Sequence, residues 1–422
     1  MIKKILDTFV EPAAFIVLFY VTINRIIFGG GWLDIAHNTF EKVSMECILW
    51  ILVFVLFLWI ASQKQNFAQY VLAWRKNWIL LVFILFAAVS LFWSEIFIVS
   101  FYKVFVLIFC SAIAAYIGIT YPINIFMRKL VLFFIVITVL SYGIVIIFPG
   151  VGVHFGDEHT GAWRGLFFHK NILGIFMAFG ATIFLTNTFR SKIKFSYRLF
   201  YLAFYMLAGG LVIQSRSAAG ILLFVIMNGS LLIMLVWLKL KNRLNRIHYI
   251  LIALIFIGLL IAILTNLNFV FGLLNKNSTL TGRVPLWSFL LTGGLPRHPL
   301  IGSGFGFPWS IDPLRLVIKN AIGWGFAPIT AHNGFIDMYL HFGLVGIILL
   351  STLLLTGIQR SIRSLITEQT LQSFLPLLLM IFIVFSNLSE SFFLEMESFA
   401  WLFLTFALFT SPVKALIQPE QL

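Results

Sequence analysis

The stretch of sequence that organises this chain runs from residue 279 to residue 346. It opens with TLTGRVPLWSFLLTGGLPRHPLIGSGFGFPW at residues 279–309 and closes with APITAHNGFIDMYLHFGLVG at residues 327–346. Almost everywhere else the chain is apolar enough to sit in lipid, whereas Gly, Pro, Arg, Trp and His interrupt the apolar runs here. In a membrane protein, backbone leaves the helical state only where protein or a water-filled cavity surrounds it. This stretch therefore predicts a functional site, and the other segments predict its scaffold.

The composition indicates an all-α, polytopic integral membrane protein. The 422 residues are 61% hydrophobic and 10% charged, and several apolar runs exceed the roughly 18 residues that a membrane span needs. No polar region is long enough to form a core of its own, so we expect one transmembrane domain over residues 1–422. The first apolar run lacks a small-residue cleavage site, which predicts an uncleaved first span. Cys47 and Cys110 both fall in predicted spans, which argues against a disulfide or zinc framework.

Hydropathy predicts about twelve transmembrane helices, at residues 11–28, 43–61, 78–93, 96–119, 128–148, 171–188, 198–213, 218–239, 248–266, 334–357, 373–389 and 392–411. With the N-terminus inside, most of the 29 Lys and Arg fall in cytoplasmic segments, as the positive-inside bias requires. We therefore expect both termini in the cytoplasm. Residues 268–333, between spans nine and ten, then form a large external loop with short helices. On this topology the net charge of +14 needs no nucleic-acid partner.

Several cations remain on the external side, against the orientation bias. Arg164 lies in one external loop, Arg216 in the short turn QSRSAAG, and Arg283 in the large loop, while Lys103 lies within the fourth span. Embedded cations usually face a partner or a water-filled cavity. Two structural alternatives stay open: Lys103 could snorkel to the outer headgroups, and the Arg216 turn could serve only to cap helices through its serines.

His332 is the candidate general base. It directly precedes the long apolar run of span ten, so we expect it in the first helical turn at the external membrane surface. A helix N-terminus attracts anions and disfavours a protonated imidazole, and a neutral imidazole is what a base needs. Gly343 and Gly346 follow about three and four turns later on the same face, where a helix or a lipid chain could approach. The alternative is an interfacial helix cap with two ordinary packing glycines.

Arg283 begins a second amphipathic element. Gly282 and Pro285 indicate a turn that enters a short helix, with Trp287 suited to the membrane interface. An arginine held at headgroup level can bind a phosphate through two hydrogen bonds. In the following PRHPLIGSGFG segment, which contains His298, prolines supply rigidity and glycines allow close backbone approach.

Two patterns are given less weight. The glycine-rich residues 302–306 resemble a phosphate-binding loop, but no strand precedes them, which argues against nucleotide binding. The acidic residues Glu390, Glu395 and Glu397 lie in the last external turn without a nearby His, which favours a solvated or acid-capped helix end over a metal site. What remains is an external site at the lipid boundary with fixed cations, one base and no metal cage. Such a site suits transfer of a headgroup from a phosphate-bearing lipid.

These residues resemble the bacterial O-antigen ligase superfamily, which includes O-antigen and exopolysaccharide polymerases. The resemblance rests on SRSAAG with Arg216, TGRVPLW with Arg283, HPLIGSGFG from His298, and His332-Asn333 followed after nine residues by Gly343-x-x-Gly346. RGLFFHKNILG from Arg164 is similar to the family's entry to the sixth span.

The resemblance implies a GT-C-like membrane glycosyltransferase of the bacterial inner membrane with its active site facing the periplasm. The implied donor is a glycan on undecaprenyl diphosphate, and transfer is metal-independent, uses no cofactor and inverts the anomeric carbon. His332 would be the base. Arg216 and Arg283, with Arg164 and Lys103, would bind the diphosphate, while Asn333, Gly343, Gly346 and His298 support the site.

The acceptor separates two activities within this resemblance. A ligase transfers the glycan to lipid A core, whereas a polymerase transfers it to a second lipid-linked glycan. The His332 motif favours the ligase, while Gly294, eleven residues after Arg283, fits a polymerase spacing. A transporter or flippase is the alternative outside enzymes, because twelve spans with embedded charges suit transport too. The chain shows no similarity between residues 1–211 and 212–422, which favours an enzyme.

Overall fold

The computed structural model describes residues 67–156, 159–241, 282–393 and 399–410. Within these ranges the chain is helical and contains no strand, apart from one isolated bridge between Val153 and Trp163. The predicted spans at 11–28, 43–61 and 248–266, and residues 268–281 of the predicted external loop, lie outside the described residues. The helices are α3 (Phe67–Lys76), α4 (Trp78–Val89), η1 (Ser90–Trp93), α5 (Phe97–Thr120), α6 (Ile123–Ile147), α7 (Pro149–Gly152), α8 (Lys170–Thr188), α9 (Phe195–Gln214), α10 (Ala218–Leu240), α13 (Arg283–Thr292), α14 (Asp312–Ile322), α15 (Gly334–Glu368), η2 (Gln372–Phe374), α16 (Leu375–Asn387) and α17 (Phe399–Thr410).

Six of the described helices, α5, α6, α8, α9, α10 and α15, are long and apolar enough to cross a membrane. A seventh crossing is possible if α3 and the segment from α4 through η1 count as one span, since they are bent by 80° at a short break. The helices α16 and α17 are apolar but shorter. The all-α, multi-pass class predicted from the sequence is therefore confirmed, while the total of about twelve spans stays a prediction.

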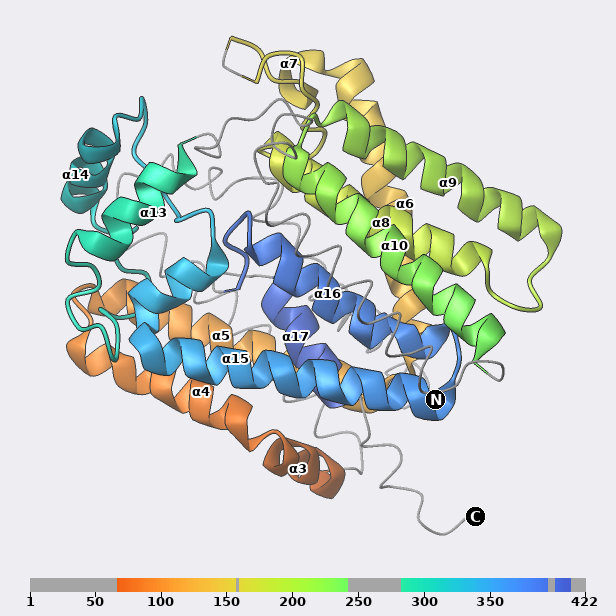
Figure 1. Cartoon of the computed structure of the whole chain (residues 1–422), viewed down its shortest axis with the longest axis horizontal. Coiled ribbons are helices and arrows are strands. Elements are labelled where there is room, and N and C mark those ends of the chain that lie inside the picture. The colour runs from red at the N-terminus through yellow and green to blue at the C-terminus, as the bar shows by residue number, and fades with distance from the viewer. Residues whose placement is uncertain (1–66, 157–158, 242–281, 394–398, 411–422) are drawn as a thin grey trace, which may run out of the picture.

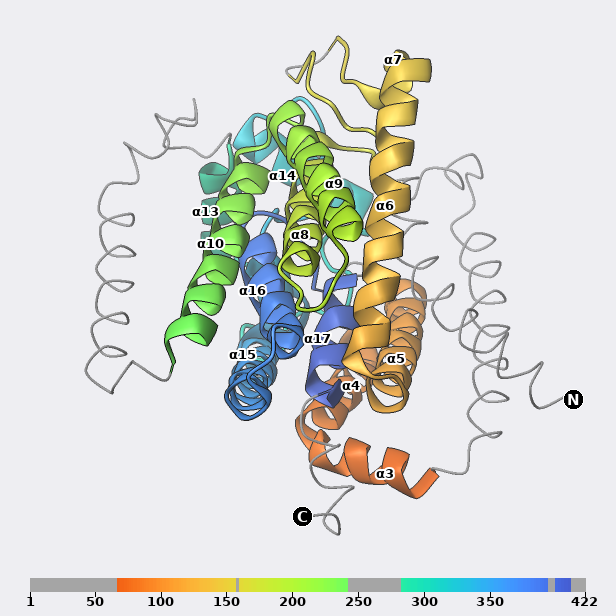
Figure 2. The same cartoon turned by 90° about the vertical axis from the view of Figure 1, so that its right-hand side faces the viewer.

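The helix α8 lies near the centre of one half of the molecule and packs against both α9 and α10 (Figure 2). It is buried along most of its length, whereas only a small share of α9 and α10 is buried and both carry exposed apolar side chains. Exposed apolar side chains on long helices are what a lipid-facing surface requires. In Figure 1, α15 crosses the other half beside α4, α16 and α17, and the short helices α13 and α14 lie next to its beginning.

The loop before α14 is bound to α15 at a break in that helix. At Gly343 the backbone adopts φ 61° and ψ −158°, a conformation that essentially only glycine tolerates. The loop before α14 docks across this break: Leu344 and Val345 donate their N–H groups to the carbonyls of Pro299 and Leu300, each at 3.0 Å. Ser303 and Gly304 in turn donate to the carbonyls of Leu340 and His341, each at 3.1 Å. The loop thus replaces the helical hydrogen bonds that the break removes.

The docked loop corrects the expected role of the two motif glycines. A Cβ atom on Gly343 would collide with the backbone of Leu300, and one on Gly302 would collide with the backbone at His341. A Cβ atom on Gly346 would collide with the side chain of Phe342 in its own helix. Gly343 and Gly346 therefore do not form one continuous helix face for another helix or a lipid chain, since the chain's own loop occupies the position at Gly343.

Lys103 lies beneath this loop rather than at the headgroups. The residue is 6% exposed, and its Nζ lies 5.4 Å from the centroid of the Phe305 ring. On the same helix, Ser100 donates from Oγ to the carbonyl of Phe305 at 2.6 Å. The glycine-rich residues 302–306 thus lie between α5 and α15 and are bonded to both helices. Because Lys103 is buried beneath them, the snorkelling alternative for Lys103 is wrong.

Candidate functional site

The turn that carries His332 is fixed on both sides by side chains. Asp337, which is 4% exposed, accepts the N–H of Ala331 at 3.1 Å and the indole N–H of Trp309 at 2.7 Å. The carbonyl of Ala331 accepts the indole N–H of Trp287 at 2.7 Å. His332 follows with φ +50°, in the left-handed region that L residues rarely adopt. These contacts therefore fix the backbone at the turn that carries His332.

The helix begins after His332, which corrects the expected position of this residue. Asn333 is the N-cap of α15, and its Oδ1 accepts the N–H groups of Phe335 at 3.0 Å and Ile336 at 3.3 Å. The backbone N–H of Asn333 donates to Ser391 Oγ at 3.1 Å. His332 thus stands one residue before the cap rather than in the first helical turn. Asn333 lies next to the candidate base and caps α15.

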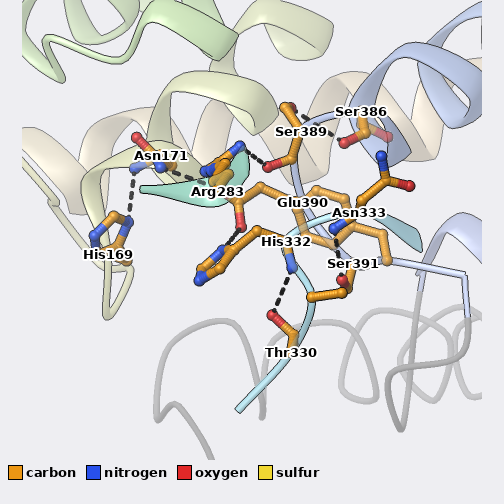
Figure 3. A network of polar contacts seen from close by, with 12 residues as sticks. His169, Asn171, Arg283, Thr330, His332, Asn333, Ser386, Ser389, Glu390 and Ser391 are labelled. Carbon is orange, nitrogen blue, oxygen red and sulfur yellow. Dashed lines mark hydrogen bonds and ion pairs between the residues drawn. The ribbon is translucent and has the colours of Figure 1, made fainter. Parts of the chain in front are cut away.

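Glu390 connects His332 to Arg283 (Figure 3). The carboxylate lies in the turn after α16, and the residue is 8% exposed. Its Oε2 lies 2.9 Å from His332 Nδ1, and its Oε1 lies 2.7 Å from a guanidinium nitrogen of Arg283. The side-chain amide of Asn171 donates to the same Oε1 at 2.9 Å. The expectation of a solvated acidic helix end is wrong for Glu390, while Glu395 and Glu397 lie outside the described residues.

The charges around Glu390 define the protonation of this site. Burial alone would raise the pKa of Glu390, but the charges of His332 and Arg283 outweigh it and hold the pKa well below its usual range. The ionised carboxylate can only accept hydrogen bonds, so His332 Nδ1 must carry the proton that they share. In a neutral imidazole, Nε2 then keeps its lone pair. The His332 side chain is 26% exposed.

Arg283 stands at the first residue of α13. Gly282 is the N-cap, with φ +83°, and a Cβ atom there would approach Trp324 Nε1 to 2.6 Å. The predicted turn into a short helix is therefore confirmed. Besides Glu390, the guanidinium donates to the backbone carbonyl of Ser389. The buried side chains Leu286 and Leu290 hold α13 against α14 and the start of α15.

His169 and Asn171 bring the beginning of α8 to the same site. His169 is the N-cap of α8, and its Nδ1 accepts the N–H of Asn171 at 3.2 Å. Burial lowers the pKa of His169 to about 4; the charge of Glu390 opposes this, and the neighbouring histidines reinforce it. The rings of His154, His159 and His169 lie 5.2–5.6 Å from one another.

The other predicted cations occupy the loops beside α8. Arg216 is exposed, has φ +48°, and donates from Nη1 to the carbonyl of Thr160 at 3.4 Å. Lys170 Nζ donates to the carbonyl of Arg216 at 3.3 Å, and Arg164 Nε donates to the carbonyl of Val151 at 2.7 Å. Ser217 caps α10 by accepting the N–H of Gly220 at 3.1 Å, so the turn does have a capping role.

The structure therefore brings only some of the predicted site residues together. His332 and Arg283 share a carboxylate, whereas neither Arg164 nor Arg216 contacts Glu390 or His332 within residues 67–156, 159–241, 282–393 and 399–410. His298 has an exposed side chain, and its carbonyl accepts the N–H of Gly302 in the docked loop at 2.7 Å. The described residues contain no group of three or more His, Cys, Asp or Glu placed to hold a metal ion.

Glu390, Asn171 and His169 were missed by the sequence interpretation. Glu390 was considered as a metal ligand and then interpreted as part of a helix end, because the sequence shows no His nearby. The signal that could have found it is the need of Arg283, a half-buried cation, for a counter-ion. The polar N-terminus of α8, HKN, gives no comparable signal, because such residues are common helix caps.

A comparison with protein families matches residues 201–351 to the family model described as O-antigen ligase. The matched segment contains Arg216, Arg283, His332, Gly343 and Gly346. It ends before Glu390 and begins after Asn171. The predicted resemblance to the O-antigen ligase superfamily is thereby confirmed. A comparison with curated proteins finds no match.

Proposed function

Because residues 201–351 match the family model described as O-antigen ligase, we propose that the protein is a glycosyltransferase that acts on lipid-linked glycan. The donor is a glycan on undecaprenyl diphosphate, and the acceptor is a sugar hydroxyl of lipid A core. The protein resides in the bacterial inner membrane, with both termini in the cytoplasm and the site facing the periplasm. The orientation rests on the distribution of Lys and Arg along the sequence.

The observation that carries the proposal is the environment of His332. One imidazole nitrogen is bonded to a carboxylate, the other has no hydrogen-bond partner among the described residues, and Arg283 lies on the same carboxylate. A general base needs one nitrogen with a lone pair within reach of the substrate. Cations beside a departing diphosphate stabilise the charge that develops there.

In the reaction we propose, His332 Nε2 takes the proton of the acceptor hydroxyl as its oxygen attacks the anomeric carbon. The bond from that carbon to the diphosphate oxygen breaks, and undecaprenyl diphosphate leaves with the electron pair. Attack from the side opposite the leaving group inverts the anomeric carbon. Arg216 and Arg283 bind the diphosphate, supported by Arg164 and Lys103. This step requires neither a metal ion nor a cofactor.

A polymerase is the second candidate. It would use the same donor and the same base, with a second undecaprenyl-linked glycan as acceptor. The specific observation in its favour is Gly294, eleven residues after Arg283. In the structure Gly294 has φ +81°, and a Cβ atom added to it would meet no atom within 4 Å, so its place in the loop leaves room beside α13.

A deletion strain separates these activities. We expect long glycan to accumulate on undecaprenyl diphosphate while the surface glycolipid runs on a gel as bare lipid A core, which identifies the ligase. Single repeats on the carrier, with at most one repeat transferred, would identify the polymerase. Unchanged carrier and surface pools would contradict both and favour a transporter.

Complementation with His332→Ala tests the base. General-base catalysis contributes about 10²- to 10⁴-fold in rate, so this variant should restore no glycan transfer on the gel while its abundance in membranes matches the wild type. Full restoration of the surface glycolipid by His332→Ala would refute the assignment of His332 as the base.

A further inference from the structure

We propose that Glu390 is a positioning residue for the base: it orients His332, fixes which of its nitrogens is free, and stabilises its protonated form. The inference rests on the proposed function, in which His332 accepts a proton. It goes beyond the family match, because residue 390 lies outside the matched residues 201–351. The contacts of the Glu390 carboxylate support this role.

Both oxygens of Glu390 are occupied, and each serves a different part of the molecule. Oε2 is bonded to His332 Nδ1 at 2.9 Å, while Oε1 accepts from Arg283 at 2.7 Å and from Asn171 at 2.9 Å. A carboxylate with donors on both oxygens cannot rotate without losing one of them. The orientation of Oε2 toward the imidazole is therefore set by Arg283 and Asn171.

The backbone around Glu390 is equally constrained. Its N–H donates to the carbonyl of Ser386 at 3.0 Å, and Asn387 Oδ1 accepts the N–H groups of Phe392 and Phe393, both at 2.8 Å. Ser391 in the same turn accepts the N–H of Asn333. The turn that carries Glu390 thus also holds the residue next to His332, so carboxylate and imidazole share one rigid support.

The charge arrangement suits a group that gains a proton during the reaction. Before the step, the negative Glu390 is balanced by the positive Arg283, and the neutral form of His332 that acts as a base keeps its proton on Nδ1, against the carboxylate. When Nε2 accepts the proton of the attacking hydroxyl, the imidazolium lies against the carboxylate, which stabilises it. Among the described residues, the charged and titratable groups that face His332 are Glu390 from the turn after α16, Arg283 from α13 and His169 at the start of α8.

A purely structural role for Glu390 would predict a different outcome. An ion pair between Arg283 and Glu390 could fasten α13 to the turn after α16 without any effect on His332. The two roles differ in one measurable property, the protonation of the imidazole, which only the positioning role ties to Glu390.

Chemical modification measures this property without a substrate. The full-length protein, in lipid nanodiscs, is treated with diethyl pyrocarbonate, which reacts with neutral imidazole, and His332 is followed by mass spectrometry across the pH range in which imidazoles titrate. The variants are Glu390→Gln, Glu390→Asp, which keeps the charge, and the matched control Glu368→Gln at the exposed end of α15.

The midpoint of His332 modification should move to lower pH in Glu390→Gln, because loss of a neighbouring opposite charge disfavours the protonated imidazole. Glu390→Asp should give a smaller shift and Glu368→Gln none, with the exposed His298 as internal reference. A Glu390→Gln protein that modifies His298 normally and titrates His332 as the wild type does would overturn the proposal.

A measurement on the unaltered protein covers the case in which Glu390→Gln does not fold. Nitrogen-15 NMR of histidine-labelled protein at neutral pH should show the proton of His332 on Nδ1, with the signal assigned by its loss in His332→Gln. A proton on Nε2 instead would overturn the proposal.

Glycan transfer in the complemented deletion strain distinguishes failure of the proposed function from failure of the positioning role of Glu390. We expect Glu390→Gln to lower transfer at least tenfold and Glu390→Asp to restore part of it. The deletion could leave every glycan pool unchanged while Glu390→Gln still alters the pH dependence of His332 modification. In that case the proposed function fails, and the effect of Glu390 on His332 stands. If the wild type transfers glycan and Glu390→Gln does so equally well, the positioning role fails and the proposed function stands.

Discussion

Arg283 makes two bonds in different directions, one to Glu390 Oε1 and one to the carbonyl of Ser389. A lysine ammonium at this position would carry the same charge but could not reproduce the planar fork that joins both acceptors. We therefore expect Arg283→Lys to lower glycan transfer by about tenfold or more, measured on gels at matched protein abundance.

Arg297→Lys is the matched control for this substitution. Arg297 pairs with Glu95 at 3.2 Å, but its side chain is 66% exposed, and such surface pairs contribute little. Transfer by this control should stay near the wild-type level. Near-native transfer by Arg283→Lys as well would show that charge alone matters at position 283.

His169 makes the cap of α8 dependent on pH. Because its pKa is lowered from 6.5 to about 4 in the folded protein, the unfolded chain binds a proton between these values that the folded protein excludes. Folding is therefore destabilised as the pH falls from about 6.5 toward 4. Asn caps helices without titrating, so His169→Asn should lose part of this fall in melting temperature.

The measurement is thermal unfolding in detergent at several pH values from neutral down to about 4. The melting temperature of the wild type minus that of His169→Asn should decrease as the pH falls, because only the wild type carries the titrating cap. A difference that stays constant across the whole range would contradict the assignment of His169 as that cap.

The sequence identified His332 and Arg283 because each stands in a local motif, whereas Glu390 acts through tertiary contact. It lies 58 residues from His332 and 107 from Arg283 along the chain. No periodicity or spacing encodes contacts at such separations, so the acidic turn could be read only as a helix end. The need of a half-buried arginine for a counter-ion was the one physical clue available.

At the level of secondary structure, the break in α15 depends on Gly343. Its φ and ψ values are strained for any residue with a Cβ atom, and that atom would also meet the docked loop. Gly343→Ala should therefore lower the free energy of unfolding by roughly 2 kcal/mol or more, seen as a lower melting temperature in detergent.

Gly229 in α10 provides the control for this change. An added Cβ atom there meets nothing within 4 Å, so Gly229→Ala should keep or raise the melting temperature, since alanine is the better helix former. Equal melting temperatures for the two variants would contradict the structural role assigned to the break.

The length and apolar character of the helices followed from hydropathy, but the break did not. The predicted spans at 96–119, 171–188 and 218–239 correspond closely to α5, α8 and α10. The spacing of Gly343 and Gly346 was recognised, yet it was interpreted as a packing face of an unbroken helix. Backbone bonds from the loop at residues 299–304 decide otherwise, and these form only in the folded chain.

For the whole molecule, the distribution of Lys and Arg predicts which end faces the cytoplasm. The connection between α8 and α9 carries Arg190, Lys192 and Lys194, and should lie inside, whereas α14 should lie outside. A membrane-impermeant maleimide should therefore label Asn320→Cys in intact spheroplasts, and Ser191→Cys only after permeabilisation. Both positions are exposed in the structure. Labelling in the opposite order would reverse the topology and move the site to the cytoplasmic face.

The loop docked on α15 also bears on how the protein is made. Chains are synthesised from the N-terminus, so residues 299–304 exist before residues 340–345 enter the bilayer. The carbonyls that receive the amides of Leu344 and Val345 are thus ready when the break arrives. A circular permutant in which the loop is translated after α15 would expose these groups to lipid for a time, at a cost of several kcal/mol each. The order of the two segments along the chain therefore allows these bonds to form as soon as the break is made.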